Sequence, residues 1–426
     1  MERELHYVWR NRIFPATGLI TTEGKKISVL SSGLHNKDAG PDFFCADIII
    51  GAENLMGNVE IHVRSTDWYR HGHDKDPAYN NVVLHVVEQD DGEAITQDGR
   101  KIPQLVLPVP EYVKINYARL QDISKTPPCY SYASEVPAII RNGWFERLCN
   151  DRLKRKANDI KERLEYCNRD WEYAFFITIA RAFGFGINSD AFEQWARIIP
   201  YGGIAKHRDN FVQILAMFLG QAGFLGNNSQ YSELISASIE DLNAKDLHIL
   251  ECAHKPPLEI VEREYKFLAD KFSLTLMSSH VWRFMRTRPS NFPIVRIIQL
   301  ARLYNAGHVR LSAVIEADTL NEVHDIFSSV RLSKSTINLL IINAVVPMLY
   351  SYGLYKGIPK LCLKSQRFLR EIPAENNKYT RLWAQTSLPI ANAAESQAIV
   401  QLISRYCERH DCLRCQLGHQ YIKHMK

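Results

Sequence analysis

The sequence predicts an α+β protein in which an N-terminal domain with a mixed β-sheet precedes a large all-helical domain. Three observations lead to this fold class. Short apolar runs with strand-like composition fill residues 1–110. A segment containing three prolines, residues 124–137, then interrupts the chain. Beyond it, apolar residues recur with the helical period. We therefore expect domains at residues 1–125 and 137–426.

The N-terminal domain is predicted to contain one short helix followed by strands. Residues 4–13 are amphipathic and predict the helix, and residues 19–22 and 26–31 flank Glu23-Gly24-Lys25 and predict a hairpin. The remaining strands are predicted at residues 43–50, 59–64 and 82–87, and residues 94–96 and 104–107 are predicted to form a last hairpin around Asp98-Gly99.

The second domain is predicted to be helical throughout. Its expected helices are residues 142–166, 171–183, 190–199, 211–222, 257–272, 295–304, 311–317, 320–328, 336–351 and 393–407. The stretch 171–183 is mostly apolar, which indicates a core helix.

The composition is that of a soluble globular protein. The chain has 426 residues, of which 46% are hydrophobic and 23% charged, and it has a formal net charge of +5. It has no run of the length a membrane span needs and no secretory signal, so we expect no membrane partner and a cytoplasmic location. Its nine cysteines are then expected to be thiols or metal ligands rather than disulfides.

Groups suited to chemistry converge around two of the predicted strands. Asp42 directly precedes the strand at residues 43–50. Glu60 and His62 share one face of the next strand, because side chains alternate along a strand with a period of two. A short link suggests that the two strands form a hairpin. Asp42, Glu60 and His62 would then lie within reach of one metal ion.

Pro41-Asp42 followed by Glu60-Ile61-His62 resembles the motif of the restriction-endonuclease-like nucleases. The resemblance covers roughly residues 1–110 and includes the order of elements: a helix, three strands, a connecting segment and a fourth strand. It implies Mg²⁺ or Mn²⁺ held by Asp42 and Glu60, which would activate water to attack a phosphodiester bond. It also implies that His62 is catalytic, although this histidine replaces the lysine of the motif and is not a constant positive charge.

Further histidines allow a different metal site. His71 and His73 lie in a polar segment, and His62 and His85 can join them from neighbouring strands. Neutral imidazole suits zinc, iron, nickel or copper better than magnesium. The alternative reading has no metal: Asp42 caps a turn, Glu60 lies on a solvated face, and His85 is a hydrogen-bonded core residue.

The C-terminal cysteines form a second candidate metal site, with a structural role. Its predicted ligands are Cys407, Cys412, Cys415 and His419. Three thiols at this spacing can hold a zinc ion, and His410 or Cys129 are other possible fourth ligands. The resemblance to the nuclease superfamily implies an iron–sulfur cluster as the alternative. Partly buried free thiols are the reading without metal.

Basic residues of the helical domain are candidates for binding DNA or RNA. They are Arg152, Lys154, Arg155, Arg283, Arg286 and Arg288. The last three flank Trp282 and Phe284, and arginine beside aromatic rings suits both phosphate contacts and base stacking. Acidic residues are interleaved with the first three, so an ordinary solvated helix face is the alternative.

Several separated motifs resemble one bacterial family, catalogued as domain of unknown function 2851 and found mainly among the Bacteroidetes. They are NKDAGPD (36–42), GNVEIH (57–62), WYRHGH (68–73), YNNVVLHVV (79–87), AFGF (182–185) with Asn188, RPSN (288–291) and CLRC (412–415). The resemblance spans nearly the whole chain and implies no particular activity.

Three hypotheses follow for the function. The first is a divalent-metal-dependent nuclease-like protein that acts on or binds nucleic acid. The second is a metalloenzyme of another kind with a histidine-rich site, and the third is a catalytically silent binding or scaffold protein. Close approach of Asp42 and Glu60 would favour the first, and convergence of three histidines would favour the second. Wide separation of all these groups would favour the third.

Overall fold

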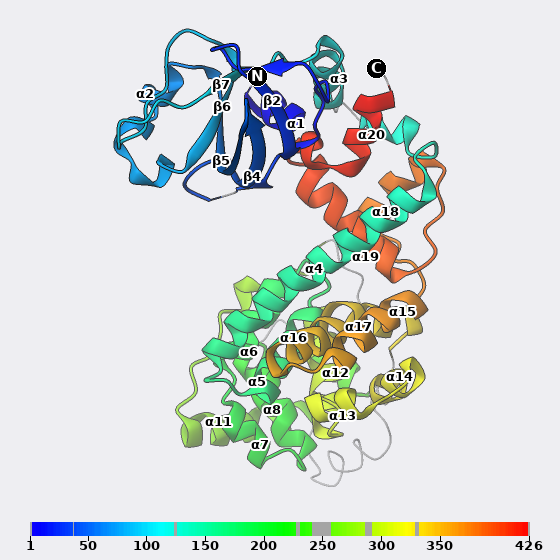
Figure 1. Ribbon diagram of the computed structural model, residues 1–426. Coiled ribbons are helices and arrows are strands. Elements are labelled where there is room, and N and C mark those ends of the chain that lie inside the picture. The colour runs from blue at the N-terminus through cyan, green and yellow to red at the C-terminus, as the bar shows by residue number, and fades with distance from the viewer. Residues whose placement is uncertain are drawn as a thin grey trace. The chain divides into compact units, whose positions relative to one another are not determined.

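The computed structural model describes residues 2–36, 38–122, 126–226, 231–240, 257–285, 292–328 and 332–424. The chain forms two compact units (Figure 1). The first, which we call the sheet unit, contains Met1–Phe145, Asn377–Pro389 and Ile399–Lys426. The second, the helical unit, contains Glu146–Asn376 and Ile390–Ala398. The predicted α+β class is confirmed.

The division into units differs from the predicted boundary at residues 125–137, because the end of the chain returns to the sheet unit. The C-terminal helix α20 (Gln416–His424) packs against α3 (Glu111–Gln121). The amide of Asn116 in α3 donates to the carbonyl of Ile422. These contacts join residues about three hundred positions apart, so local sequence patterns do not reveal them.

The sheet unit is built on a seven-stranded mixed sheet. Along the main path the strand order is β1-β2-β4-β5-β6-β7, and β3 pairs with β4. Neighbours from β1 to β5 are antiparallel, whereas β5, β6 and β7 run parallel. The strands are β1 (Leu19–Ile20), β2 (Lys26–Ser31), β3 (Leu34–His35), β4 (Phe43–Ile50), β5 (Glu53–Arg64), β6 (Val82–Gln89) and β7 (Gln104–Val106).

Helix α1 (Glu2–Arg10) packs against β5 and forms part of the core of the sheet unit. Leu5, Val8 and Trp9 are fully buried, and the Trp9 indole donates to the carbonyl of Ser32 at 3.0 Å. Burying side chains of this size stabilises the fold by about 1.5–3 kcal/mol each. The helix thereby fixes the position of its remaining residues, including His6, relative to the sheet.

The last predicted hairpin does not form. Ile95 makes a single bridge with Lys101, and β7 pairs in parallel with β6, where Gln104 lies opposite His85. The turn at Asp98-Gly99 is closed within itself by Thr96 and Arg100. β7 thus pairs with the preceding strand β6 in parallel, and the segment between them forms its own short turn.

Gly57 allows β5 to approach β6 just before Glu60. A Cβ atom at this position would lie 2.3 Å from Cγ1 of Val83 and 2.7 Å from the carbonyl oxygen of Asn81. The register of the β5–β6 pair shifts between Asn58 and Val59, one residue further on. Any larger residue at position 57 would push the strands apart at the start of the predicted site.

The other helices of the sheet unit are short. They are α2 (Asp67–Arg70), η1 (His73–Lys75), η2 (Pro77–Tyr79), η3 (Pro128–Tyr132), α18 (Lys378–Trp383), η7 (Ala384–Thr386), the π-helical turn η8 (Ile403–Cys407) and η9 (Cys412–Arg414). Helices α4 (Ala138–Tyr166) and α19 (Ala393–Leu402) contribute residues to both units.

The helical unit confirms the predicted helices closely; α5 and α11 have the predicted bounds. Its elements are α5 (Trp171–Phe183), α6 (Ser189–Ile198), α7 (Tyr201–Lys206), α8 (Phe211–Gln221), α9 (Ser232–Glu240), α11 (Pro257–Phe272), η4 (Ser279–Val281), α12 (Pro293–Asn305), α13 (Leu311–Glu316), α14 (Leu320–Ser328), α15 (Lys334–Leu340), the π-helical turn η6 (Ile341–Val345), α16 (Val346–Lys356) and α17 (Pro359–Glu371). The continuous stretch Lys334–Lys356 is long and apolar enough to span a membrane, but 72% of its most apolar window is buried, as in a core helix.

Candidate metal centre

Asp42 and Glu60 interlock at the junction of β4 and β5. The backbone N–H of Asp42 donates to Glu60 Oε2 at 3.1 Å. In return, the backbone N–H of Ile61 donates to Asp42 Oδ2 at 3.0 Å. Each carboxylate therefore fixes the other strand, and the two acidic groups lie side by side. Glu60 is 5% exposed. Burial raises its pKa, His73 opposes this effect, and the charge of Asp42 adds to it.

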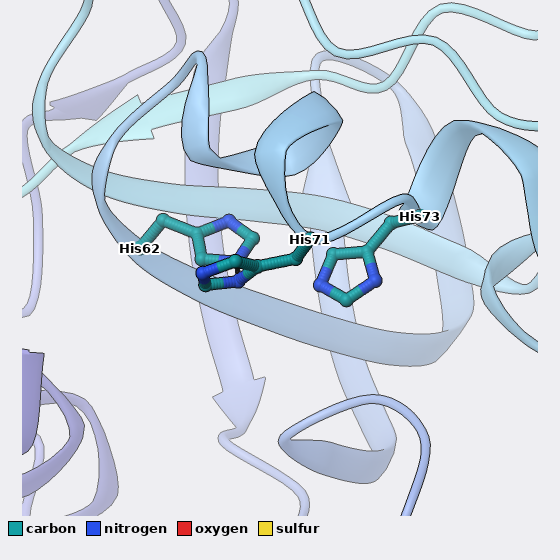
Figure 2. Close-up of side chains that lie close together, drawn as sticks. All are labelled: His62, His71 and His73. Carbon is teal, nitrogen blue, oxygen red and sulfur yellow. Dashed lines mark hydrogen bonds between the residues drawn. The ribbon is translucent and has the colours of Figure 1, made fainter.

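Three histidines converge on Glu60 from two segments. His62 follows Glu60 on β5, whereas His71 and His73 flank the end of α2 (Figure 2). Their ligand nitrogens all lie within 4.8 Å of one another. Gly72 has a φ of 77°, a left-handed conformation that glycine adopts without strain. The chain therefore turns between His71 and His73.

Three distances among these groups are close to those between two ligands of one metal ion, although the set of mutually close ligand atoms contains the three histidines and not Glu60. Two ligands about 2.0–2.1 Å from a tetrahedral ion lie about 3.3–3.4 Å apart. Glu60 Oε1 lies 3.2 Å from His73 Nε2 and 3.5 Å from His62 Nε2. His62 Nε2 in turn lies 3.1 Å from His71 Nδ1. His73 Nε2 is buried, and its polar neighbour is Glu60 Oε1, with which it forms an ion pair when the ring is protonated.

A relay of hydrogen bonds assigns the tautomer of His62. The amide nitrogen of Gln104 donates to Asp90 Oδ1 and to the carbonyl of Gly92, so its Oε1 faces His85. That oxygen accepts from His85 Nδ1 at 2.9 Å. His85 Nε2 then carries the lone pair and accepts from His62 Nδ1 at 2.9 Å. His62 Nε2 is thereby left with its lone pair directed at Glu60 and His71. Metal-binding histidines commonly have their second nitrogen fixed in this way.

Both relay histidines are held neutral. Burial, reinforced by the neighbouring His85, His73 and His71, lowers the pKa of His62 to about 2. Burial also lowers the pKa of His85 to about 4, against the opposing hydrogen bond from Gln104. His62 therefore cannot supply the positive charge of the lysine it replaces. His85 was predicted as a metal ligand, but both of its ring nitrogens are hydrogen-bonded, to His62 and to Gln104. His85 therefore orients His62 and does not itself bind metal.

His6 supplies what His62 lacks, and the sequence analysis missed it. Its Nε2 lies 3.3 Å from Asp42 Oδ2. Burial lowers its pKa, but the adjacent Asp42 carboxylate, with Glu2 and Glu60, overcomes that effect and raises the pKa above its ordinary value. The imidazole beside the carboxylate pair therefore holds a proton more readily than a free histidine does. The sequence shows that His6 lies on an amphipathic helix. That the helix packs on β5, and so brings His6 to Asp42, is visible only in the tertiary structure.

A basic cavity of about 350 Å³ lies next to His6 in the sheet unit. Its lining includes the arginines Arg3, Arg10, Arg409 and Arg414, the histidines His6, His35 and His410, and one acidic residue, Asp411, which pairs with Arg414. Burial lowers the pKa of His35 to about 4, and the positive charges of His6, Arg10 and Arg414 contribute. Arginines outnumber carboxylates in this lining, an environment that favours anions.

The C-terminal cysteines lie in the sheet unit, and one ring nitrogen of His419 is engaged elsewhere. His419 Nδ1 is hydrogen-bonded to the Tyr7 hydroxyl at 2.9 Å. The cysteine that does belong to the group is Cys129, in η3, whose pKa is raised by burial and by the three C-terminal thiols. The predicted alternative with Cys129 as fourth member therefore fits the structure better than the set with His419.

The predicted basic surface of the helical unit is only partly accessible. Lys154 and Arg283 are exposed, and Arg152 and Arg155 are half-buried; Arg286 and Arg288 lie outside the described residues. Trp282 is buried and donates to the carbonyl of Ala222, so it cannot stack on a base. Phe284 stacks on Tyr231 within the unit.

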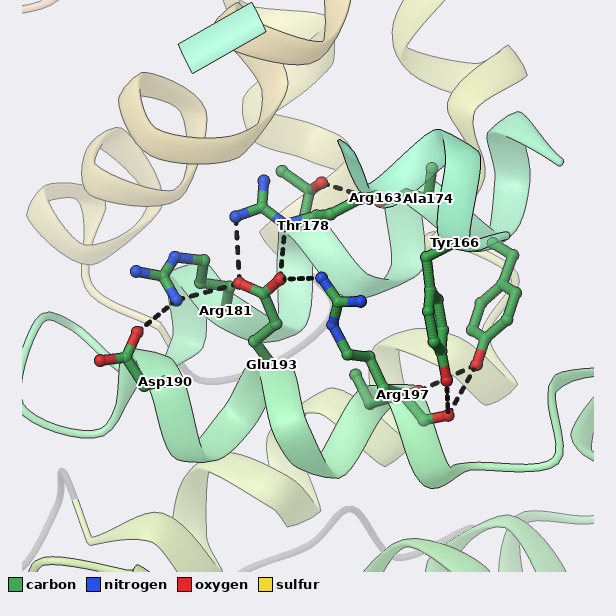
Figure 3. A network of polar contacts seen from close by, with 10 residues as sticks. Arg163, Tyr166, Ala174, Thr178, Arg181, Asp190, Glu193 and Arg197 are labelled. Carbon is green, nitrogen blue, oxygen red and sulfur yellow. Dashed lines mark hydrogen bonds and ion pairs between the residues drawn. The ribbon is translucent and has the colours of Figure 1, made fainter. Parts of the chain in front are cut away.

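Arg163, Arg181 and Arg197 of the same unit surround Glu193 (Figure 3). Burial favours protonation of Glu193, but the arginines prevail and lower its pKa to about 2. This is a satisfied ion-pair network, and its cations are engaged with protein carboxylates. The carboxylate, histidine and arginine groups of the sheet unit therefore make the stronger candidate site.

Comparison with known proteins yields a family and no function. No curated protein and no solved structure matches the chain. The sequence model of one family, described as protein of unknown function (DUF2851), matches residues 2–331 and 328–378. These matches cover most of the chain, which therefore belongs to the DUF2851 family.

Proposed function

We propose that this protein is a metal-dependent phosphodiesterase that cleaves nucleic acid, with a transition-metal ion bound in the sheet unit. The observation that carries the proposal is the joint arrangement of Asp42, Glu60 and the histidines. The two carboxylates lock together across β4 and β5, and imidazole nitrogens lie 3.2 and 3.5 Å from Glu60 Oε1. The close carboxylate pair that favours a nuclease and the converging histidines that favour another metalloenzyme thus occur at one site.

The residues have distinct roles in this proposal. Glu60, His62 and His73 hold the ion, and His71 completes the set from its exposed side. The bound metal lowers the pKa of a water ligand and so supplies a nucleophile near neutral pH. Asp42 keeps Glu60 in place and holds His6. Charged His6 stabilises negative charge that develops on the substrate, or donates a proton to the leaving oxygen.

The ligand set favours transition metals over magnesium. Mg²⁺ prefers oxygen ligands and retains several of its waters, whereas imidazole suits zinc, iron, nickel or copper. Of the two metals expected from the sequence, Mg²⁺ and Mn²⁺, this site favours Mn²⁺, because Mn²⁺ accepts both carboxylate and imidazole ligands. The buried lone pair of His62 is the main reason for this preference.

Two further observations support a nucleic-acid substrate. Helix α1, the antiparallel strands β2, β4 and β5, a connecting segment and the parallel strand β6 follow the order of the nuclease core that the sequence resembles. The basic cavity begins at His6, the residue that contacts Asp42. Arginines near the proposed metal would bind the phosphates that flank the scissile bond.

A histidine-rich hydrolase acting on other esters is the second candidate. The observation that favours it is the number of imidazoles, since three converging histidines are common in zinc hydrolases. The arginine-lined cavity argues for phosphate esters over carboxylic esters. A small diester such as bis-p-nitrophenyl phosphate and a small carboxylic ester would separate the two reactions.

The test is cleavage by the purified full-length protein. Labelled single-stranded, duplex and branched DNA, and RNA, are incubated with Mn²⁺, Zn²⁺, Co²⁺ or Mg²⁺, and with chelator alone. We expect cleavage that requires metal and that falls at least a hundredfold in Glu60→Gln and Asp42→Asn. The matched control is Glu53→Gln, which makes the same change at an exposed position of the same strand.

The outcomes are decisive once folding has been checked by circular dichroism. Cleavage retained in Glu60→Gln would mean that a contaminant is responsible. Wild-type protein no more active than Glu60→Gln on every substrate and metal would overturn the nuclease proposal. Hydrolysis of the carboxylic ester alone would establish the second candidate.

A further inference from the structure

Four cysteines from separate parts of the sequence gather in the sheet unit. Cys129 lies in η3, Cys407 in the π-helical turn η8, and Cys412 and Cys415 frame η9. All four are free thiols; Cys407 is half-buried and the others are buried. Helix α20 packs against η9 and η3, and η8 packs against η9. The fold therefore brings residues 129 and 407–415 together at one place.

Cys412 and Cys415 are joined by a single 3₁₀ turn. The N–H of Cys415 donates to the carbonyl of Cys412 at 3.1 Å, so the two thiols emerge from one tight loop. Gly418 permits α20 to start directly against this loop, because a Cβ atom there would lie 2.3 Å from the carbonyl oxygen of Cys412. Cys407 sits on a π-helical turn, an irregularity that often marks functional positions in helices.

The thiols influence one another. Burial raises the pKa of Cys129, and Cys415, Cys407 and Cys412 raise it further. Burial also raises the pKa of Cys415 to about 11, while the N–H groups of Leu417 and Gly418 hydrogen-bond its sulfur and act in the opposite direction. Four adjacent thiolates are unfavourable without a cation. N–H groups directed at sulfur are useful only once the thiol has lost its proton.

We propose that Cys129, Cys407, Cys412 and Cys415 bind an iron–sulfur cluster. Four cysteine thiolates are the standard ligand set of such clusters. The spacing favours a cluster over one zinc ion. A tetrahedral zinc ion holds sulfur ligands about 3.8 Å apart, but among the described residues the histidine set alone brings three ligand atoms within 4.8 Å. A cluster separates its thiolates further, because each of them can bind a different iron atom.

The cluster would have a structural role. It would connect the end of the chain to η3, and thereby close a loop from residue 129 to residue 407. Ligands that must be assembled from distant segments are absent from the unfolded chain, so the free energy of binding stabilises the fold. The proposal is independent of the phosphodiesterase activity proposed above, because it involves no residue of that site.

The experiment is metal and sulfide analysis of the full-length protein purified without oxygen. We expect iron and acid-labile sulfide in equal amounts, about two to four of each per chain, and a visible absorption band that bleaches on reduction. Cys412→Ser and Cys129→Ser should each lose most of this iron and the band. Cys45→Ser is the matched control, because Cys45 is exposed and lies on β4.

The wild-type protein alone can refute the proposal, so a variant that fails to fold does not weaken the test. Wild-type protein that holds no iron after anaerobic purification and reconstitution with iron and sulfide would overturn it. One zinc ion per chain, lost in Cys412→Ser, would equally overturn the cluster. Iron that is retained in both ligand variants would show that these cysteines do not bind it.

Discussion

Replacing Gln104 with leucine should weaken metal binding without removing a metal ligand. Gln104 is 3% exposed, and its Oε1 accepts from His85 Nδ1 at 2.9 Å. Without that acceptor, nothing holds the proton on His85 Nδ1. If the proton moves to Nε2, it meets the N–H of His62 Nδ1, and His62 must adopt the other tautomer. The lone pair on His62 Nε2 is then lost to the metal.

The expected loss of metal affinity follows from the indirect action of Gln104 on the ligand His62. It acts through two hydrogen bonds, and losing such supporting partners costs 10- to 100-fold in metal affinity. This corresponds to about 1.4–2.7 kcal/mol. Asp90 and His85 also lose a buried partner, so we expect the free energy of unfolding to fall by about 1–3 kcal/mol. The variant should remain folded at room temperature with a weaker site.

The assay is a titration of chelator-treated protein with Co²⁺ or Zn²⁺ in competition with a chelator of known affinity. The matched control is Gln97→Leu, which makes the same change at an exposed position, where Gln97 accepts from the Asn80 amide. Gln97→Leu should bind as the wild type does. An unchanged dissociation constant in folded Gln104→Leu would refute the relay. A loss as large as that in His62→Ala would show that Gln104 does more than set a tautomer.

Three further results are expected. Burial lowers the pKa of His85 to about 4, so the unfolded state binds more protons than the folded state as the pH falls below 6.5. The contribution of His85 to the free energy of folding should therefore weaken by about 2 kcal/mol between pH 7.5 and pH 5. Hydrogen exchange of the amides of β5 and β6 measures this change. Gly418→Ala should destabilise the sheet unit by about 1–3 kcal/mol through its clash with Cys412, whereas Gly143→Ala, which meets no atom within 4 Å, should not lower the thermal midpoint. Arg414→Gln should weaken DNA binding and reduce the slope of its salt dependence by about one, measured by fluorescence anisotropy; an unchanged slope would exclude a phosphate contact.

Sequence patterns predicted the local structure well and the pairing of distant segments less well. Strand β4 and helices α5 and α11 have the predicted bounds, because an apolar run of fixed period between turn residues determines each of them. The partner of β7 and the return of residues 399–426 to the sheet unit were not predicted. The first depends on a parallel pairing across a connecting segment and the second on contacts about three hundred residues apart, and neither leaves a periodic signal.

The same division applies to the candidate site. Asp42, Glu60 and His62 come from neighbouring strands, and the alternation of side chains predicted their proximity. His6 and Gln104 reach the site from α1 and β7, and a single sequence contains no sign of that approach. Gln104 offered one clue, since a polar residue opening an apolar strand needs a buried partner.

The replacement of lysine by His62 changes the chemistry of the site in a consistent direction. A lysine there would be a cation without a lone pair, and it would repel a metal ion. His62 is neutral, and its lone pair adds a ligand. A cation is still needed to stabilise charge on a phosphate, and His6 provides it, since its charge is favoured by Asp42. In the proposed site, the neutral histidines and Glu60 would bind the metal, and His6 would lie on the side of the arginine-lined cavity. The metal side and the His6 side meet where Asp42 and Glu60 exchange backbone hydrogen bonds, which is where a scissile phosphate would have to lie to contact both.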